Sequence, residues 1–294
     1  MRRPSAAELR PVVHPAGVKD RRSGEHWAGR LYMREVSLRI DPYLVNTRVT
    51  PNQLTYLMVL TGILGGAVLL VPGLLGAVLA VVLFQVYLLL DCVDGEVARW
   101  RGQTSVTGVY LDRVGHYLCE AALLIGFGLR GADVFRHGGG AVSWLWAFLG
   151  TLAALGAILV KAETDLVDVA RQRSGLPAVT DSASAPRSAG LALARRAAAA
   201  LRFHRLVGGI EASLLVLLAA VLDACAPTGS GLFFTRLGVV VLAAVAVAQT
   251  VLHLVSILAS SRLRAEEGAA RPGGAPEGGP DASGHTAGPG GGRD

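Results

Sequence analysis

Long apolar segments alternate with short polar stretches along most of the chain. Six segments lie at about residues 53–72, 74–98, 106–129, 141–168, 207–224 and 233–259. Each is close to the roughly 20 residues that a helix needs to cross the apolar layer of a bilayer. They are much longer than a typical β-strand of about 5–6 residues. The pattern therefore predicts an all-α polytopic membrane protein with six transmembrane helices.

The regions that flank these six segments differ in composition. Residues 1–24 are polar and are predicted to form an irregular N-terminal tail, whereas residues 25–48 mix apolar side chains with several arginines. This mixture predicts a juxtamembrane amphipathic helix at the membrane interface, although an ordinary connecting helix fits the pattern equally well. The six-helix membrane domain would then occupy residues 49–262. Residues 263–294 are rich in Gly and Pro, and we expect them to be disordered.

The distribution of positive charge predicts an orientation in the membrane. Every Lys and Arg except Arg130, Arg136 and Arg236 precedes the first segment, lies in or near the loops after the second and fourth, or follows the sixth. Because positively charged loops tend to remain cytoplasmic, we expect both termini and the loop after the second helix to face the cytoplasm of a multi-pass protein in the cell (inner or plasma) membrane. The net charge of +6 is accounted for by anionic lipid headgroups, so no nucleic acid partner is expected.

Ionisable side chains inside the second and third segments carry the main chemical signal. Asp91 and Asp94 are three residues apart, and Asp112, His116 and Glu120 follow one another at intervals of four. These spacings put each set on one helical face, and ionisable groups inside membrane helices usually face a polar cavity. If the two faces meet, their carboxylates repel one another unless a divalent cation such as Mg²⁺ binds between them. The alternative is ion pairing with nearby arginines at the headgroups.

Small residues and one arginine extend the two faces. Gly95, Ala98 and Gly108 would allow a bulky ligand to approach the backbone, and the planar guanidinium of Arg99 is suited to a diphosphate. For Arg99 the alternative is that the side chain reaches out to the membrane interface. The two faces together therefore predict a site for a phosphorylated ligand and a metal.

The stretch from Asp91 to His116 resembles the signature of the class I CDP-alcohol phosphatidyltransferases. That signature reads DxxDGxxAR, eight residues, GxxxD, three residues and D, and the chain matches each fixed position except the last, where His116 replaces Asp. The segment Thr50–Thr55 is also similar to the family's entry into its first helix. The close resemblance covers about residues 40–128.

The resemblance implies a transferase of phospholipid biosynthesis. Such an enzyme moves a substituted phosphate group, phosphatidyl for example, from CDP-diacylglycerol or another CDP-alcohol to a hydroxyl acceptor such as a polyol phosphate, and it releases CMP. The resemblance also implies a homodimer among membrane lipids, a cytoplasmic active site and one or two divalent ions, Mg²⁺ or Mn²⁺. The residues carried over are Asp91, Asp94 and Asp112 as metal ligands, and Asn52, Gly95, Ala98, Arg99, Ser105 and Gly108 at the donor nucleotide.

His116 stands where the family has the Asp that is proposed to deprotonate the acceptor hydroxyl. Imidazole has an ordinary pKa of about 6.5 and is a competent general base, so His116 is the predicted catalytic residue. It binds Mg²⁺ less well than a carboxylate does, and a metal ligand, an acceptor contact or polar packing remain alternatives. An alternative function is a catalytically altered CDP-lipid-binding relative that acts as a regulator or scaffold. A transporter is disfavoured because the acids lie near one membrane face.

Two further polar residues have more than one interpretation. Lys161 is a candidate contact for the acceptor, but an ion pair with Asp165, four residues further on, fits the spacing as well. Glu120 either orients His116 through a hydrogen bond or takes a direct part in the chemistry.

Overall fold

The structure is a computed structural model that describes residues 2–15, 28–137, 141–176, 208–227, 231–259 and 263. The chain divides into two units, residues 1–263 and residues 264–294. The tail predicted to be disordered at 263–294 therefore lies outside the described residues, apart from Leu263. The following description concerns the first unit.

Each of the six predicted apolar segments forms a helix. These helices are α3 (Pro51–Val68), α4 (Gly73–Arg101), α5 (Val106–Ala132), α7 (Ala141–Arg173), α9 (Gly209–Cys225) and α10 (Phe233–Ala259). A single turn, α6 (Val134–His137), lies between α5 and α7, and no strand occurs among the described residues. By length and composition, α4, the Trp144–Arg173 part of α7, and α10 are able to cross a membrane. The fold class is thus all-helical, with three such helices in the part of the chain that the structure describes.

Local sequence signals set the helix ends around the predicted site. The Thr50 side chain accepts a hydrogen bond from the backbone N–H of Gln53, whose side chain accepts one from Thr50 N–H, a capping box that starts α3. Gly102, with φ of 62°, ends α4, as is usual for a residue after a helix. Ser105 Oγ then accepts a 3.0 Å hydrogen bond from Gly108 N and starts α5. The turn from α4 into α5 is therefore only a few residues long.

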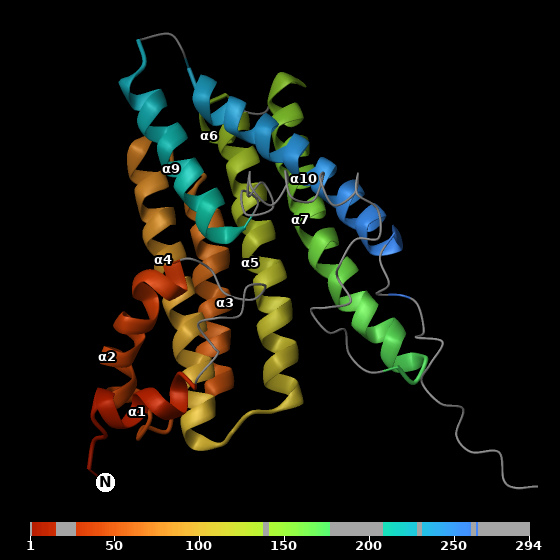
Figure 1. Ribbon diagram of the computed structural model, residues 1–294. Coiled ribbons are helices and arrows are strands. Elements are labelled where there is room, and N and C mark those ends of the chain that lie inside the picture. The colour runs from red at the N-terminus through yellow and green to blue at the C-terminus, as the bar shows by residue number, and fades with distance from the viewer. Residues whose placement is uncertain are drawn as a thin grey trace, which may run out of the picture. The chain divides into compact units, whose positions relative to one another are not determined.

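The helices pack through small residues. α3 contacts both α4 and α5, α7 packs against α5, and α9 and α10 contact each other as well as α4 and α7 respectively (Figure 1). A Cβ added at Gly126 would lie 2.2 Å from the carbonyl oxygen of Gly66, and one at Gly128 would lie 2.7 Å from the Cα of Gly150. Such close backbone approach is typical of helix interfaces in membranes. The C-terminal part of α5 is therefore held tightly against α3 and α7.

Two short helices precede α3. They are α1 (Ala6–Val13) and α2 (Arg34–Leu44), and a π-helical turn at Gly29–Met33 leads into α2. The expectation of an irregular segment over residues 1–24 is wrong for α1, because Ser5 and Glu8 form a capping box that starts a helix. α2 falls within the predicted amphipathic segment at 25–48. Its buried residues are Ser37, Leu38 and Asp41, and it contacts α4.

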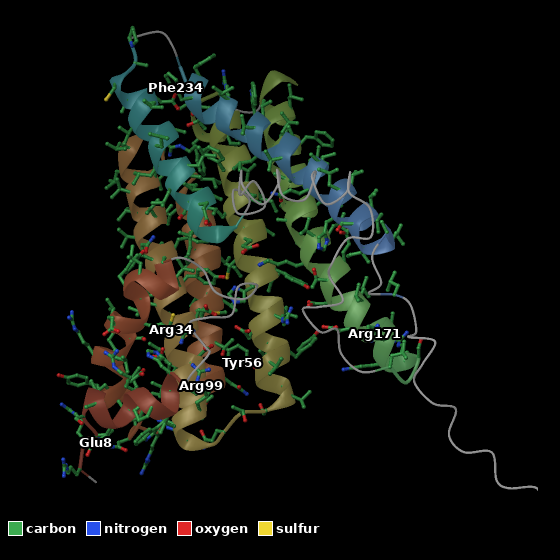
Figure 2. The ribbon with its side chains drawn as sticks, in the orientation of Figure 1. Glu8, Arg34, Tyr56, Arg99, Arg171 and Phe234 are labelled. Atoms are coloured by element: carbon green, nitrogen blue, oxygen red, sulfur yellow. The ribbon has the colours of Figure 1, made fainter. Side chains whose placement is uncertain are left out.

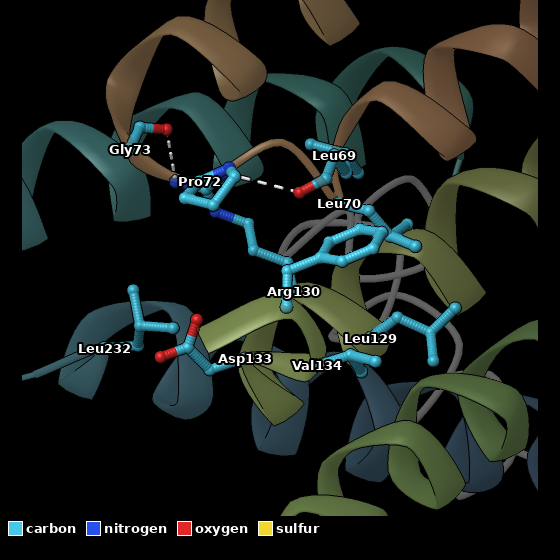
Figure 3. Close-up of a pocket in the computed structure, with 10 residues that line it drawn as sticks. Leu69, Leu70, Pro72, Gly73, Leu129, Arg130, Asp133, Val134 and Leu232 are labelled. Atoms are coloured by element: carbon cyan, nitrogen blue, oxygen red, sulfur yellow. Dashed lines mark hydrogen bonds between the residues drawn. The ribbon is translucent and has the colours of Figure 1, made fainter. Parts of the chain in front are cut away.

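Two arginines tie the helix ends to neighbouring loops. Arg101, in the last turn of α4, donates four hydrogen bonds of 2.5–3.0 Å to backbone carbonyls between α2 and α3, at Leu44, Val45, Thr47 and Val49. At the other end of α5, Arg130 donates to the carbonyls of Leu69, Val71 and Gly73 at 3.4, 3.3 and 2.8 Å (Figure 3). Arg101 thus binds the segment that joins α2 to α3, and Arg130 binds the segment that joins α3 to α4.

Candidate active site

The signature residues lie on the C-terminal half of α4 and the N-terminal half of α5. α3, which contacts both helices, brings Asn52 to the same end of the molecule through its first turn. α4 and α5 are linked there by the short turn at Gly102–Ser105. The cap residues Gly102 and Ser105 therefore bring the signature side chains of α4 and α5 to the same end of the molecule.

A cavity of about 270 Å³ opens between these three helix ends. The metal-ligand candidates Asp91, Asp94 and Asp112 line it. So do all the residues predicted to contact the donor, namely Asn52, Gly95, Ala98, Arg99, Ser105 and Gly108. Thr55, Gln103 and Thr104 line the same cavity and were not expected there. Figure 2 labels Arg99 at this end of the helices, near α1 and α2.

Asp91, Asp112 and His116 form a compact group, in which the two carboxylates line the cavity and His116 does not. His116 Nε2 lies 3.0 Å from Asp91 Oδ1 and 3.4 Å from Asp112 Oδ1, and the three ligand atoms all lie within 4.8 Å of one another. Two carboxylate oxygens and one imidazole nitrogen suit a divalent cation, with the imidazole favouring Mn²⁺ or Zn²⁺ over Mg²⁺. The donor set therefore fits a bound metal ion.

Asp94 is held separately from this group. Its side chain is buried, with 7% of the residue exposed, and its Oδ2 accepts a 2.6 Å hydrogen bond from Thr55 Oγ1. The same hydroxyl lies 3.2 Å from the carbonyl of Pro51. Thr55 was part of the Thr50–Thr55 segment that resembled the family, but its spacing alone did not reveal this contact. This hydrogen bond fixes the orientation of the Asp94 side chain in the wall of the cavity.

Tyr87 is a further residue that the sequence did not single out. Its hydroxyl makes a short hydrogen bond with Nδ1 of His116, and the tyrosine is 1% exposed. Tyr87 precedes Asp91 by four residues, so the helical spacing that linked Asp91 to Asp94 also contained this signal. The bond leaves Nε2 as the histidine nitrogen that faces Asp91 and Asp112.

Comparison with known proteins finds a family similar to part of the chain. The family model described as CDP-alcohol phosphatidyltransferase matches residues 48–180, which include the cavity-lining residues of α3, α4 and α5. The resemblance seen in the signature is confirmed, and the apolar helices together with this family make the chain a multi-pass membrane protein.

Three relatives show how far the similarity extends. Two proteins named bifunctional IPC transferase and DIPP synthase, from Aquifex aeolicus and Thermococcus kodakarensis, are each 32% identical over 48% and 49% of this chain and 30% of their own length. The archaetidylinositol phosphate synthase of Pyrococcus horikoshii is 33% identical over 38% of this chain and 53% of its own length. The match thus covers about a third of the first two relatives and half of the third.

A second polar cluster lies between α5 and α7. Lys161 Nζ pairs with Glu120 Oε2 at 2.7 Å, and Glu120 Oε1 accepts a 3.4 Å hydrogen bond from Gly209 N. Asp165 instead binds Arg113 and the Tyr117 hydroxyl. The predicted alternatives of a Lys161–Asp165 pair and a Glu120–His116 bond are therefore both wrong. Glu120 on α5 binds Lys161 on α7, and Asp165 on α7 binds Arg113 and Tyr117 on α5.

An apolar groove adjoins the cavity. It has a volume of about 810 Å³, runs between the start of α5 and the end of α7, and shares Thr104, Ser105 and Val109 with the cavity. Six of its twelve lining residues are aliphatic, and Arg113, Tyr117 and Asp165 also contribute. Lys161 lines neither the groove nor the cavity.

Proposed function

We propose that the chain is a membrane transferase of phospholipid biosynthesis. It moves a substituted phosphate group, phosphatidyl in the first instance, from a CDP-linked donor to a hydroxyl acceptor and releases CMP. The observation that carries the proposal is the single cavity of about 270 Å³ in which the signature residues of α4 and α5 meet Asn52 of α3. The family match over residues 48–180 supports the same chemistry.

The donor is proposed to bind with its nucleotide in the cavity. Gly95, Ala98 and Gly108 form walls without large side chains, and Arg99 supplies a cation for the diphosphate. Asn52 and Ser105 add polar atoms at the rim. The adjoining apolar groove of about 810 Å³ supports a lipid-linked donor such as CDP-diacylglycerol, because acyl chains need an apolar surface next to the diphosphate.

His116 is proposed to act as the general base. Its Nε2 accepts the proton of the acceptor hydroxyl, while Nδ1–H donates to the Tyr87 oxygen. The acceptor oxygen then forms a bond to the donor phosphorus, and the bond from that phosphorus to the bridging oxygen of CMP breaks, so that CMP leaves with the electron pair. The carboxylates of Asp91 and Asp112, at 3.0 and 3.4 Å, favour the protonated imidazole that results.

Asp91, Asp94 and Asp112 are proposed to hold one or two divalent ions, Mg²⁺ or Mn²⁺. The compact group that Asp91 and Asp112 form with His116 supports this assignment. A bound ion would neutralise phosphate charge on the donor. The alternative is that His116 is a further ligand of the ion.

The acceptor is proposed to be a polyol phosphate. The name of the Pyrococcus relative, archaetidylinositol phosphate synthase, makes an inositol phosphate the first candidate. Lys161 is the proposed cation for its phosphate, since 34% of the lysine side chain is exposed even though it pairs with Glu120. A lysine-to-alanine change at this position is expected to raise the KM for an acidic acceptor and to leave the KM for the donor unchanged.

The proposed arrangement in the cell is a homodimer in the cytoplasmic (inner or plasma) membrane. We propose that all six long helices cross the bilayer, that α2 lies at its interface, and that both termini and the cavity face the cytoplasm. The distribution of Lys and Arg supports this orientation. Cysteine labelling from either side of sealed vesicles tests it.

The decisive test is an assay of the purified protein. It is incubated with CDP-diacylglycerol, a pool of polyol phosphates and Mn²⁺ or Mg²⁺, and CMP release and the product mass are recorded. We expect metal-dependent turnover that is lost in Asp91→Asn and kept in Asp133→Asn, a matched change at the far end of α5. Binding of the donor without turnover, with turnover gained in His116→Asp, would instead indicate the catalytically altered relative. Absence of donor binding contradicts both.

A further inference from the structure

Helix α1 packs against the rear of the signature helix, although it lies outside the matched residues 48–180. Leu9 and Val13 are fully buried in a cluster with Leu38 of α2 and with Val93 and Val97 of α4. Val93 is two residues from both Asp91 and Gly95, so at 100° per residue its side chain lies on roughly the opposite face of α4. α1 therefore supports the helix that forms one wall of the cavity (Figure 1).

Polar contacts fix the end of α1 in this position. His14 Nε2 lies 2.7 Å from Glu96 Oε1, and their side chains are only 3% and 0% exposed. Arg10 donates two hydrogen bonds, of 3.1 and 2.7 Å, to the carboxylate of Glu35 in the first turn of α2. Both contacts lie at the C-terminal end of α1, because Arg10 is in its last turn and His14 is its C-cap residue. They hold the last backbone carbonyls of the helix in place.

One of those carbonyls binds Arg99. The Val13 oxygen accepts a 3.0 Å hydrogen bond from Arg99 Nε. Carbonyls of a helix's last turn have no partner within the helix, and the negative end of the helix dipole favours a cation there. With Nε engaged, the guanidinium extends over Gly95, and Nη1 lies 3.1 Å from the position of a Cβ on that glycine. Both Nη groups are thus directed along the cavity wall.

We propose that α1 is a positioning element of the donor site, which holds Arg99 so that its two Nη groups face the diphosphate of the CDP-linked donor. The proposal rests on the proposed function, because it takes Arg99 as a donor contact. It adds that a segment preceding the family domain completes the nucleotide site. Without α1, Arg99 keeps its charge but must be ordered anew each time a donor binds, and such ordering weakens binding.

The test measures CDP binding by titration calorimetry on the full-length purified protein, together with KM values for donor and acceptor. Leu9→Asp puts a charge into the buried contact of α1, and His14→Ala is a milder variant in case the first fails to fold. Arg2→Ala, an exposed position on the same segment, is the control. We expect CDP affinity to fall about 5-fold, the order of magnitude for ordering one long side chain. The KM for the donor should rise equally, with the acceptor KM unchanged.

A background lacking Arg99 separates positioning from general support of the fold. In Arg99→Ala, the α1 variants should cause no further loss of CDP affinity. An equal loss with and without Arg99, or an equal rise in the acceptor KM, overturns the proposal. If CDP binding depends on Arg99 but not on α1, this inference alone fails. If CDP binding does not depend on Arg99 at all, the donor assignment of the proposed function fails with it.

Discussion

The hydrogen bond between Tyr87 and His116 gives the sharpest prediction about catalysis. Tyr87→Phe removes only the hydroxyl, since the ring remains in its buried position and keeps its edge contact with Phe84 at 5.5 Å between centroids. His116 Nδ1 is then left without this partner in a buried place. The hydroxyl fixes the tautomer and orientation of the imidazole, and loss of such an orienting partner costs about 10- to 100-fold in activity. We expect kcat to fall roughly ten-fold.

The assay is CMP release at saturating donor and acceptor, measured for four proteins. These are the parent, Tyr87→Phe, His116→Asp and the double variant. His116→Asp restores the family's carboxylate and removes Nδ1, so we expect it to retain activity within about ten-fold and to become insensitive to Tyr87→Phe. The same loss in both backgrounds would refute the role of Tyr87 in orienting the histidine, because the hydroxyl would then act elsewhere.

Three further predictions concern neighbouring parts of the structure. Gly95→Ala would place a Cβ 3.1 Å from Arg99 Nη1, so the donor KM should rise several-fold while the melting temperature stays constant. Arg130→Met removes the donor to three backbone carbonyls and should lower stability by about 3 kcal/mol, measured as a lower melting temperature in detergent. Burial, followed by the neighbouring carboxyl of Glu96, raises the pKa of Asp41 from 3.8 to about 9. Between about pH 4 and pH 9 the Asp41 carboxyl keeps its proton in the folded protein and loses it in the unfolded chain. The free energy of unfolding therefore falls as the pH rises through this range. Asp41→Asn should show a smaller fall in melting temperature over that range.

The sequence predicted those features that depend on helical periodicity. All six apolar segments form helices, and the intervals of three and four residues brought Asp91, Asp112 and His116 together as expected. The spacing within each set depends only on positions along one helix, whereas the contact of Asp91 on α4 with His116 on α5 also depends on how the two helices pack. The cavity followed because α4 and α5 are joined by a short turn.

Contacts between different helices could not be predicted in the same way. Lys161 has a carboxylate four residues away on its own helix, yet it pairs with Glu120 on α5, because the choice depends on how the two helices are rotated relative to each other. Tyr87 was not predicted because an aromatic residue within an apolar segment is usually part of the hydrophobic core. α1 was overlooked because eight residues are too few for a clear hydrophobic period, although its capping box was present in the sequence.

The glycine contacts between α3, α5 and α7 have a mechanical consequence for the site. Gly126 and Gly66 touch at one end of α5, whereas Asp112 lies 14 residues away, about 21 Å along the helix axis. A helix is stiff over such a length, so a small tilt imposed at Gly126 would displace Asp112 relative to Asp91. Residues near the C-terminal end of α5 would then act as a lever on the distance between the carboxylates. Natural variation at these glycines should therefore alter metal preference without changing any residue of the cavity.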